Sequence, residues 1–253
     1  MHAFHAHFYI ILGAVGLLGG YIDAIAGGSG LLTLPVLLSL GLPAHVAIGT
    51  NKLGSVIGML SSVTVYIRKK LYHPKNWWPV VLMTFIAGLC GAIFVHFINI
   101  DWLAKFIPIL IIFVAIYFAI PKLTSLVARE YTYQPSLGKA SILSAILGFY
   151  DGAIGAGTGS FWTTALMIVF RLNLLQASAV ARLLNYTSTI ASFLIFACYG
   201  SINYLAGIVL GFGLIIGAYV GAHSAIRFGK NFIKPVFLIV VLSLAAKLIW
   251  QYW

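Results

Sequence analysis

Long apolar runs dominate this sequence and constrain its fold more than any other feature. Several of them reach the about 20 residues that an α-helix needs to cross a bilayer. Only 8% of the residues are charged and 62% are hydrophobic, whereas a soluble domain carries roughly a quarter charged residues. The short alternating segments of a β-barrel are not evident. We therefore predict an all-α, polytopic membrane protein, with apolar segments at 8–26, 28–41, 45–67, 77–98, 103–121, 139–154, 158–170, 175–199, 203–223 and 233–252.

Two of the segments, 28–41 and 158–170, are shorter than the about 20 residues of a typical span. Each follows a glycine cluster that ends the preceding segment, in "GYIDAIAGGSGLLT" (20–33) and "GFYDGAIGAGTGSF" (148–161). Non-helical backbone inside a bilayer survives only where protein or a water-filled cavity surrounds it. We expect each pair to form either a broken helix or a helical hairpin, with its glycine tip inside the membrane.

The order of one short pair and three longer segments occurs twice. It predicts a first transmembrane repeat at 1–121, a cytoplasmic linker at 122–138 and a second transmembrane repeat at 139–253. Each repeat would cross the membrane an odd number of times, so the second would enter from the opposite face. Such an inverted repeat with broken helices is typical of secondary transporters, whose substrate sites lie near the midplane.

The net charge of +11 is explained by the membrane and does not indicate nucleic-acid binding. Basic residues accumulate in cytoplasmic loops, and an orientation with both termini outside the membrane places most of the 15 Lys and Arg residues inside. Only Lys105 and Lys247 then fall outside. The residues placed inside are Arg68, Lys69, Lys70, Lys75, Lys122, Arg129, Lys139, Arg171, Arg227, Lys230 and Lys234.

The glycine clusters are candidate anion sites. A half-helix that begins after each cluster presents free N–H groups and a positive dipole end, and nearby hydroxyls add donors. The alternative is close helix packing through small residues. The predicted contacts to substrate at the two tips are Gly28, Ser29, Gly30, Gly157, Thr158 and Gly159.

Two acidic residues, Asp23 and Asp151, precede the two glycine clusters. They are two of only four acids in the chain, and the others, Asp101 and Glu130, lie in predicted loops. A charge inside a membrane is a functional candidate because its insertion is costly. Asp23 and Asp151 could take up protons or hold a cation, or they could cap the next half-helix or pair with a basic residue.

Two basic residues, Lys52 and Arg182, lie at matching depths in the segments that follow the short pairs. Arginine suits bidentate binding of an oxyanion, and lysine supplies a compact charge. Asn51 and Asn185 share these segments, so all four are predicted substrate contacts. The alternative is an internal ion pair in each half, Asp23 with Lys52 and Asp151 with Arg182.

These residues resemble the signatures of the TauE/SafE family of membrane proteins. The first resemblance is carried by "YIDAIAGGSGLLTLPVLLSLGLPAHVAIGTNKLGS", and the second by "GFYDGAIGAGTGSF" followed by "ASAVARLLNYTS". The resemblance covers essentially the whole chain and implies a multi-helix bacterial inner-membrane protein that transports sulfite or organosulfonates. Ser29 stands where many relatives carry another glycine, and Arg182 stands where lysine is frequent.

Together these features predict a secondary transporter of small sulfur-containing oxyanions that works by alternating access. An anion channel and a non-transporting membrane partner in sulfur metabolism are the alternatives. We expect no enzyme, because no nucleophile–base arrangement and no nucleotide-binding loop is present. No cofactor or metal is expected. The expected partners are a small anionic substrate, the lipid bilayer and a coupling proton or ion, with no prediction of oligomeric state.

Overall fold

The computed structural model describes residues 6–98 and 137–228, and every regular element in these two ranges is a helix. This confirms the predicted all-α class. The predicted spans at 103–121 and 233–252 and nearly all of the linker lie outside the described residues. The helices are α1 (Ala6–Ala26), α2 (Ser29–Ser39), α3 (Ala44–Arg68), the 3₁₀ turn η1 (Pro74–Trp77), α4 (Trp78–His96), α6 (Leu137–Leu143), the π-helical turn η3 (Ser144–Gly148), α7 (Phe149–Ala153), α8 (Thr158–Phe170), α9 (Leu174–Cys198) and α10 (Tyr204–Phe228).

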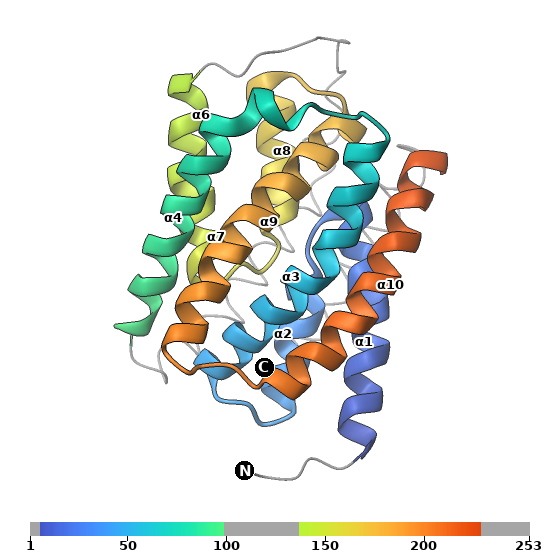
Figure 1. Cartoon of the computed structure of the whole chain (residues 1–253), viewed down its shortest axis with the longest axis vertical. Coiled ribbons are helices and arrows are strands. Elements are labelled where there is room, and N and C mark those ends of the chain that lie inside the picture. Colours follow the sequence, from blue (N-terminus) through green and yellow to red (C-terminus); the bar gives the residue numbers. More distant parts are fainter. Residues whose placement is uncertain (1–5, 99–136, 229–253) are drawn as a thin grey trace, which may run out of the picture.

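The two short pairs are hairpins. In Figure 1, α1 starts at the lower end of the bundle, reaches its middle, and α2 returns to the lower end, where α3 begins. The run from α6 through α7 starts at the upper end, and α8 returns there before α9 begins. The hairpins thus enter from opposite ends, as the predicted inverted repeat requires. The complete inverted relation and its division into repeats stay predictions.

The helices pack as two bundles that do not coincide with the two halves of the sequence. One bundle contains α1, α2, α3 and α10, and the other contains α4, η3, α7, α8 and α9. Helix α10, from the second half, packs against α1 and α3, while α4, from the first half, packs against α7 and α9. The bundles meet mainly along α3 and α9, which lie side by side (Figure 1).

Large apolar side chains cover the outer faces of the described helices. Ile10 on α1 is 69% exposed and Phe212 on α10 is 64% exposed, and Ile86 on α4 is also exposed. Soluble monomers rarely expose extended apolar patches, so these faces suit lipid. Within residues 6–98 and 137–228, four helices are long and apolar enough to cross a membrane: His7–Ile25, Pro74–His96, Leu174–Cys198 and Tyr204–Phe228.

Close packing of α1 against α10 depends on glycine, and we expect Gly217→Ala to destabilise the protein. A Cβ at Gly217 would overlap the backbone carbonyl of Leu17 on α1, and overpacking costs typically about 1–3 kcal/mol. Thermal unfolding in detergent should therefore begin at a lower temperature. Gly13→Ala on α1 is the matched control, because a Cβ there would meet no heavy atom within 4 Å. Equal melting temperatures for the two variants would contradict this packing.

Candidate functional site

The first hairpin tip is closed by a carboxylate. Gly27 and Gly28 have φ of 80° and 136°, which only glycine adopts without strain. They turn the chain so that the side chain of Asp23, at the end of α1, faces the start of α2. Its Oδ1 accepts hydrogen bonds from the backbone N–H groups of Gly28 at 2.9 Å and Ser29 at 3.1 Å. Asp23 therefore caps α2. Its negative charge neutralises part of the positive charge at the start of α2, where the sequence predicted substrate binding.

The second tip, turned by Gly155 and Gly157 at φ of 80° and 75°, uses its carboxylate differently. Asp151 accepts no bond from the start of α8 and instead takes donors from α9. The hydroxyls of Ser188 and Thr189 donate to its Oδ2 at 2.5 and 3.2 Å. The side-chain amide of Asn185 also faces this carboxylate; with its nitrogen assigned to that side, it donates to both oxygens at 3.2 Å.

The two cations pair across the bundles. Lys52 Nζ lies 3.2 Å from Asp151 Oδ1 and also donates to the backbone carbonyl of Asp151. Arg182 Nη1 lies 3.3 Å from Asp23 Oδ1. The pairing expected within each half, Asp23 with Lys52 and Asp151 with Arg182, is wrong. Depth along a helix does not determine which tip a cation meets, because the packing of α3 and α9 brings each cation to the tip of the other half.

Arg182 is fully buried between the two tips. A Cβ on Gly159 would lie 3.0 Å from Arg182 Cζ, and one on Gly27 would overlap Nη2. The tips also touch directly, because the Ser160 hydroxyl donates to the Gly27 carbonyl. Arg182 Nε and Nη2 have no hydrogen-bond partner among the described residues. Gly27 and Gly159 thus allow the two tips to pack closely and leave room for the Arg182 guanidinium between them.

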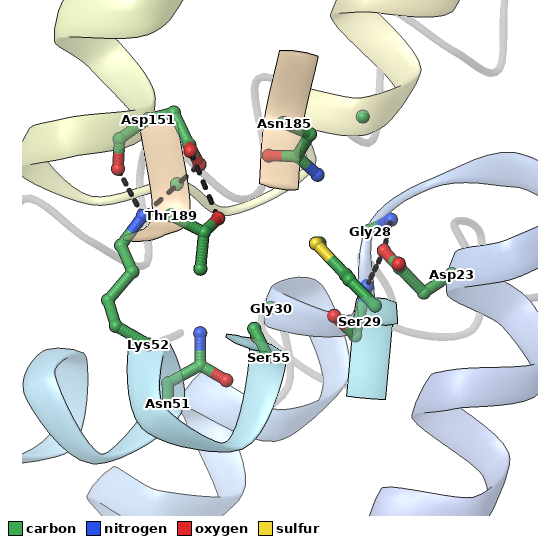
Figure 2. Close-up of a pocket in the computed structure, with 13 residues that line it drawn as sticks. Asp23, Gly28, Ser29, Gly30, Asn51, Lys52, Ser55, Asp151, Asn185 and Thr189 are labelled. Atoms are coloured by element: carbon green, nitrogen blue, oxygen red, sulfur yellow. Dashed lines mark hydrogen bonds and ion pairs between the residues drawn. The ribbon is translucent and has the colours of Figure 1, made fainter. Parts of the chain in front are cut away.

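A small cavity lies where the tips meet (Figure 2). It is lined by Asp23, Gly28, Ser29, Gly30, Asn51, Lys52, Ser55, Met59, Asp151, Gly155, Gly159, Asn185 and Thr189. The volume that the centre of a water molecule can reach is about 10 Å³, roughly what one water needs. Most predicted site residues line it, but Arg182, Gly157 and Thr158 do not.

Met59 and Thr189 are lining residues that the sequence prediction missed. Met59 lies seven residues after Lys52, and Thr189 lies seven residues after Arg182. Both lie on the helix face of the predicted cation. Following the helix faces of Lys52 and Arg182 for two further turns would therefore have found them.

Donors from α3 face carboxylates from the tips across the cavity. In Figure 2 the Lys52 side chain extends from α3 toward Asp151, while Asp23 lies on the opposite side beside Gly28 and Ser29. The Thr33 hydroxyl donates to Asn51 Oδ1 at 2.5 Å, which leaves the Asn51 amide nitrogen for the cavity. The two cations balance the two carboxylates, so the centre has no net charge.

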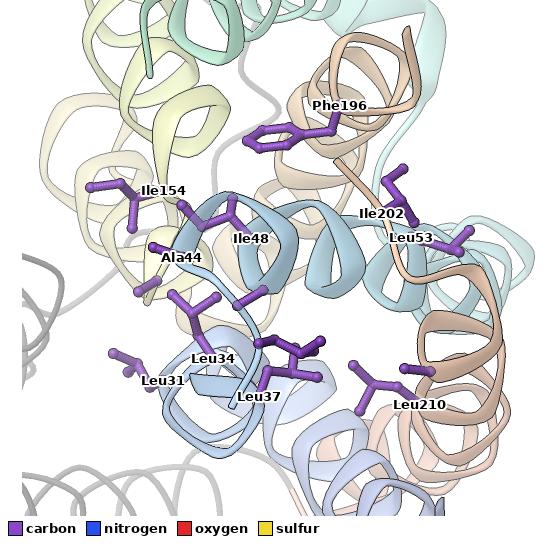
Figure 3. Close-up of a cluster of buried hydrophobic side chains, with 14 of the residues drawn as sticks. Leu31, Leu34, Leu37, Ala44, Ile48, Leu53, Ile154, Phe196, Ile202 and Leu210 are labelled. Carbon is purple, nitrogen blue, oxygen red and sulfur yellow. The ribbon is translucent and has the colours of Figure 1, made fainter. Parts of the chain in front are cut away.

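Apolar side chains close the bundle on both sides of this polar centre. The start of α3 and the end of α9 belong to one buried apolar cluster. The end of α3, with Val65 and Tyr66, and the start of α9 belong to a second cluster. The first cluster, shown in Figure 3, includes Leu34, Ile48 and Phe196. Trp162 and Phe170 belong to the second cluster. Apolar packing thus lies on both sides of the cavity along α3 and α9.

A double-mutant cycle on thermal unfolding tests the crossed pairing. Arg182→Met leaves a buried carboxylate without its cation, which costs about 3–5 kcal/mol, whereas Asp23→Asn keeps an oxygen for the cap. We expect the pair to show a coupling energy of about 0.5–3 kcal/mol. The control cycle, Lys52→Met with Asp23→Asn, should give a smaller value. The reverse ranking would contradict the crossed arrangement.

Comparison with known proteins gives one family and relatives along nearly the whole chain. A probable membrane transporter protein of Haemophilus influenzae is 36% identical over 242 residues, which cover 95% of this chain and 94% of the relative. The probable membrane transporter protein YfcA of Escherichia coli K12 is 36% identical over 242 residues, 95% of this chain and 89% of the relative. The probable membrane transporter protein ORF9 of a Sinorhizobium species is 32% identical, with 98% and 94% covered.

The family model for the sulfite exporter TauE/SafE matches residues 12–248. This range contains both glycine tips, both carboxylates and both cations. By this match and by these relatives, the chain belongs to the sulfite exporter TauE/SafE family.

Proposed function

We propose that this protein is a secondary transporter that carries small sulfur-containing oxyanions, such as sulfite, sulfoacetate or another organosulfonate, across the bacterial inner membrane. The observation that carries the proposal is the small polar cavity between two hairpin tips, with Lys52 in its wall and Arg182 directly behind it. The family description and the names of the relatives support transport. Both termini lie on the outer side in this proposal, as the basic loops favour.

The donors around the cavity are suited to an oxyanion. Lys52, the amide of Asn51 and the hydroxyls of Ser29 and Ser55 line it, and together they offer a charge and several N–H and O–H groups. Oxyanions form strong hydrogen bonds with charged donors. Arg182 joins the site when Gly27 and Gly159 separate, because these glycines now enclose its guanidinium.

Transport by this site requires the two bundles to move. A space of about 10 Å³ holds roughly one water, so a sulfonate enters only after the walls separate. Both ion pairs and the Ser160–Gly27 hydrogen bond join the two bundles. We infer that the bundles rock about the contact between α3 and α9, opening one apolar side and then the other. The moving bodies are therefore the bundles and not the sequence halves.

Uptake of radiolabelled sulfite and sulfoacetate by liposomes containing the purified protein tests this function. Loss of a charged hydrogen-bond donor costs about 1.5–3 kcal/mol, so Lys52→Gln and Arg182→Gln should each weaken the apparent affinity roughly 10- to 100-fold. Lys52→Arg and Arg182→Lys, which keep the positive charge, should retain part of the wild-type affinity. Lys139→Ala, which removes an exposed basic residue of α6, is the control and should transport normally.

The same liposomes distinguish the alternatives. Saturable uptake with exchange of labelled for unlabelled anion is expected of a transporter. Ohmic, unsaturated current would indicate an anion channel, and failure to move any sulfur oxyanion would favour the non-transporting partner. Normal uptake by both glutamine variants would contradict the central site.

A further inference from the structure

We propose that Asp23 is the proton-binding residue of this transporter, and that one proton crosses with each monoanion. This inference rests on the proposed function and adds the coupling ion and its site. It starts from the charge balance of the centre. Lys52, Arg182, Asp23 and Asp151 are its ionised side chains among the described residues, and their charges cancel.

A monoanion that enters a neutral, buried centre leaves one negative charge without a partner. An uncompensated buried charge is strongly unfavourable, and rearranging the two ion pairs does not alter the sum. A single proton on one carboxylate restores neutrality. The charge balance thus requires a positive co-ion, and the carboxylates are the groups in the cavity wall that can take up a proton.

Geometry selects Asp23 over Asp151. Both oxygens of Asp151 accept hydrogen bonds, Oδ1 from Lys52 and Oδ2 from Ser188 and Thr189. A proton on Oδ1 would displace Lys52, and a proton on Oδ2 would force the Ser188 hydroxyl to accept and to turn its own proton to a backbone carbonyl. Asp23 uses only Oδ1, and none of the described residues donates to its Oδ2, although the residue lines the cavity. A proton on Oδ2 leaves the cap of α2 in place.

Protonation of Asp23 would also free the cation that the anion needs. The link between Asp23 and Arg182 is one contact at 3.3 Å, and two nitrogen atoms of Arg182 have no partner within the described parts of the chain. Once Asp23 is neutral, Arg182 carries an unbalanced charge and a set of free N–H donors beside the cavity. Anion binding and proton binding therefore favour each other, and this linkage is reciprocal.

The other titratable groups around Asp23 do not replace it. Tyr66, on α3, faces it and donates its hydroxyl to the Ala24 carbonyl. Lys52 lies across the cavity and is held by Asp151. Helices α2 and α8 contain no ionisable side chain. The ionisable side chains of α10 are exposed: Tyr204, Tyr219, His223 and Arg227.

Liposomes with an internal pH-sensitive dye test this proposal, with methanesulfonate as the probe. This ion is the anion of a strong acid, so it does not cross the lipid as a neutral molecule and carries no proton by itself. An inward gradient should acidify the interior in the presence of wild-type protein. Uptake should be insensitive to a potassium diffusion potential, because the charge that moves is zero.

Asp23→Asn keeps an oxygen for the cap but binds no proton. We expect this variant to exchange labelled for unlabelled methanesulfonate, to lose internal acidification, and to take up anion faster when the interior is made positive. Asp23→Ala removes cap and charge together and should lower the melting temperature, which Asp23→Asn should change less.

The outcomes separate the two proposals. Methanesulfonate exchange by the wild type without acidification, or equal acidification with Asp23→Asn, would overturn the proton site and leave the transporter intact. Absence of exchange by the wild type would overturn methanesulfonate transport and this inference with it. Acidification that is lost in Asp23→Asn while exchange persists supports both.

Discussion

Two buried ion pairs, Lys52 with Asp151 and Arg182 with Asp23, hold the centre of this protein together. A charge placed alone in a membrane interior is strongly unfavourable, so each cation needs the carboxylate that faces it. Because each pair joins one bundle to the other, the pairs also fix how the bundles meet. The glycines follow from this constraint, since side chains at Gly27 and Gly159 would occupy the space of the Arg182 guanidinium.

The two carboxylates stand at matching sequence positions and have different surroundings. Asp23 caps the half-helix that follows it, and Asp151 is surrounded by donors from α9. The difference lies in the facing helices: α9 has Asn185, Ser188 and Thr189, whereas α3 has Ser55, Gly58 and Met59 at the equivalent spacing from its cation. One carboxylate is thus held by hydrogen bonds on both oxygens, whereas the other has an oxygen to which no described residue donates.

Helix α4, from the first half of the sequence, packs with helices of the second half, and α10, from the second half, packs with helices of the first half. Each of the two bundles is therefore built from both halves of the sequence. Within each bundle, glycines permit close helix contact, as between α1 and α10. Between the bundles, the centre relies on ion pairs and hydrogen bonds, which in the proposed transport cycle exchange partners with the anion. The two apolar clusters pack on either side of the cavity, one toward each end of the bundle.

The sequence by itself determined the membrane class, the helices, the two glycine breaks and the set of charged residues at the centre. Apolar run length, glycine and rare intramembrane charge act locally along the chain and are readable there. Only the tertiary structure decided that the breaks form hairpins, that the ion pairs cross between the halves, and that Arg182 lies behind the cavity wall. Those outcomes depend on how α3 packs on α9 and on which helix faces each tip. Such contacts join residues about a hundred or more positions apart, so they cannot be predicted from the local sequence pattern.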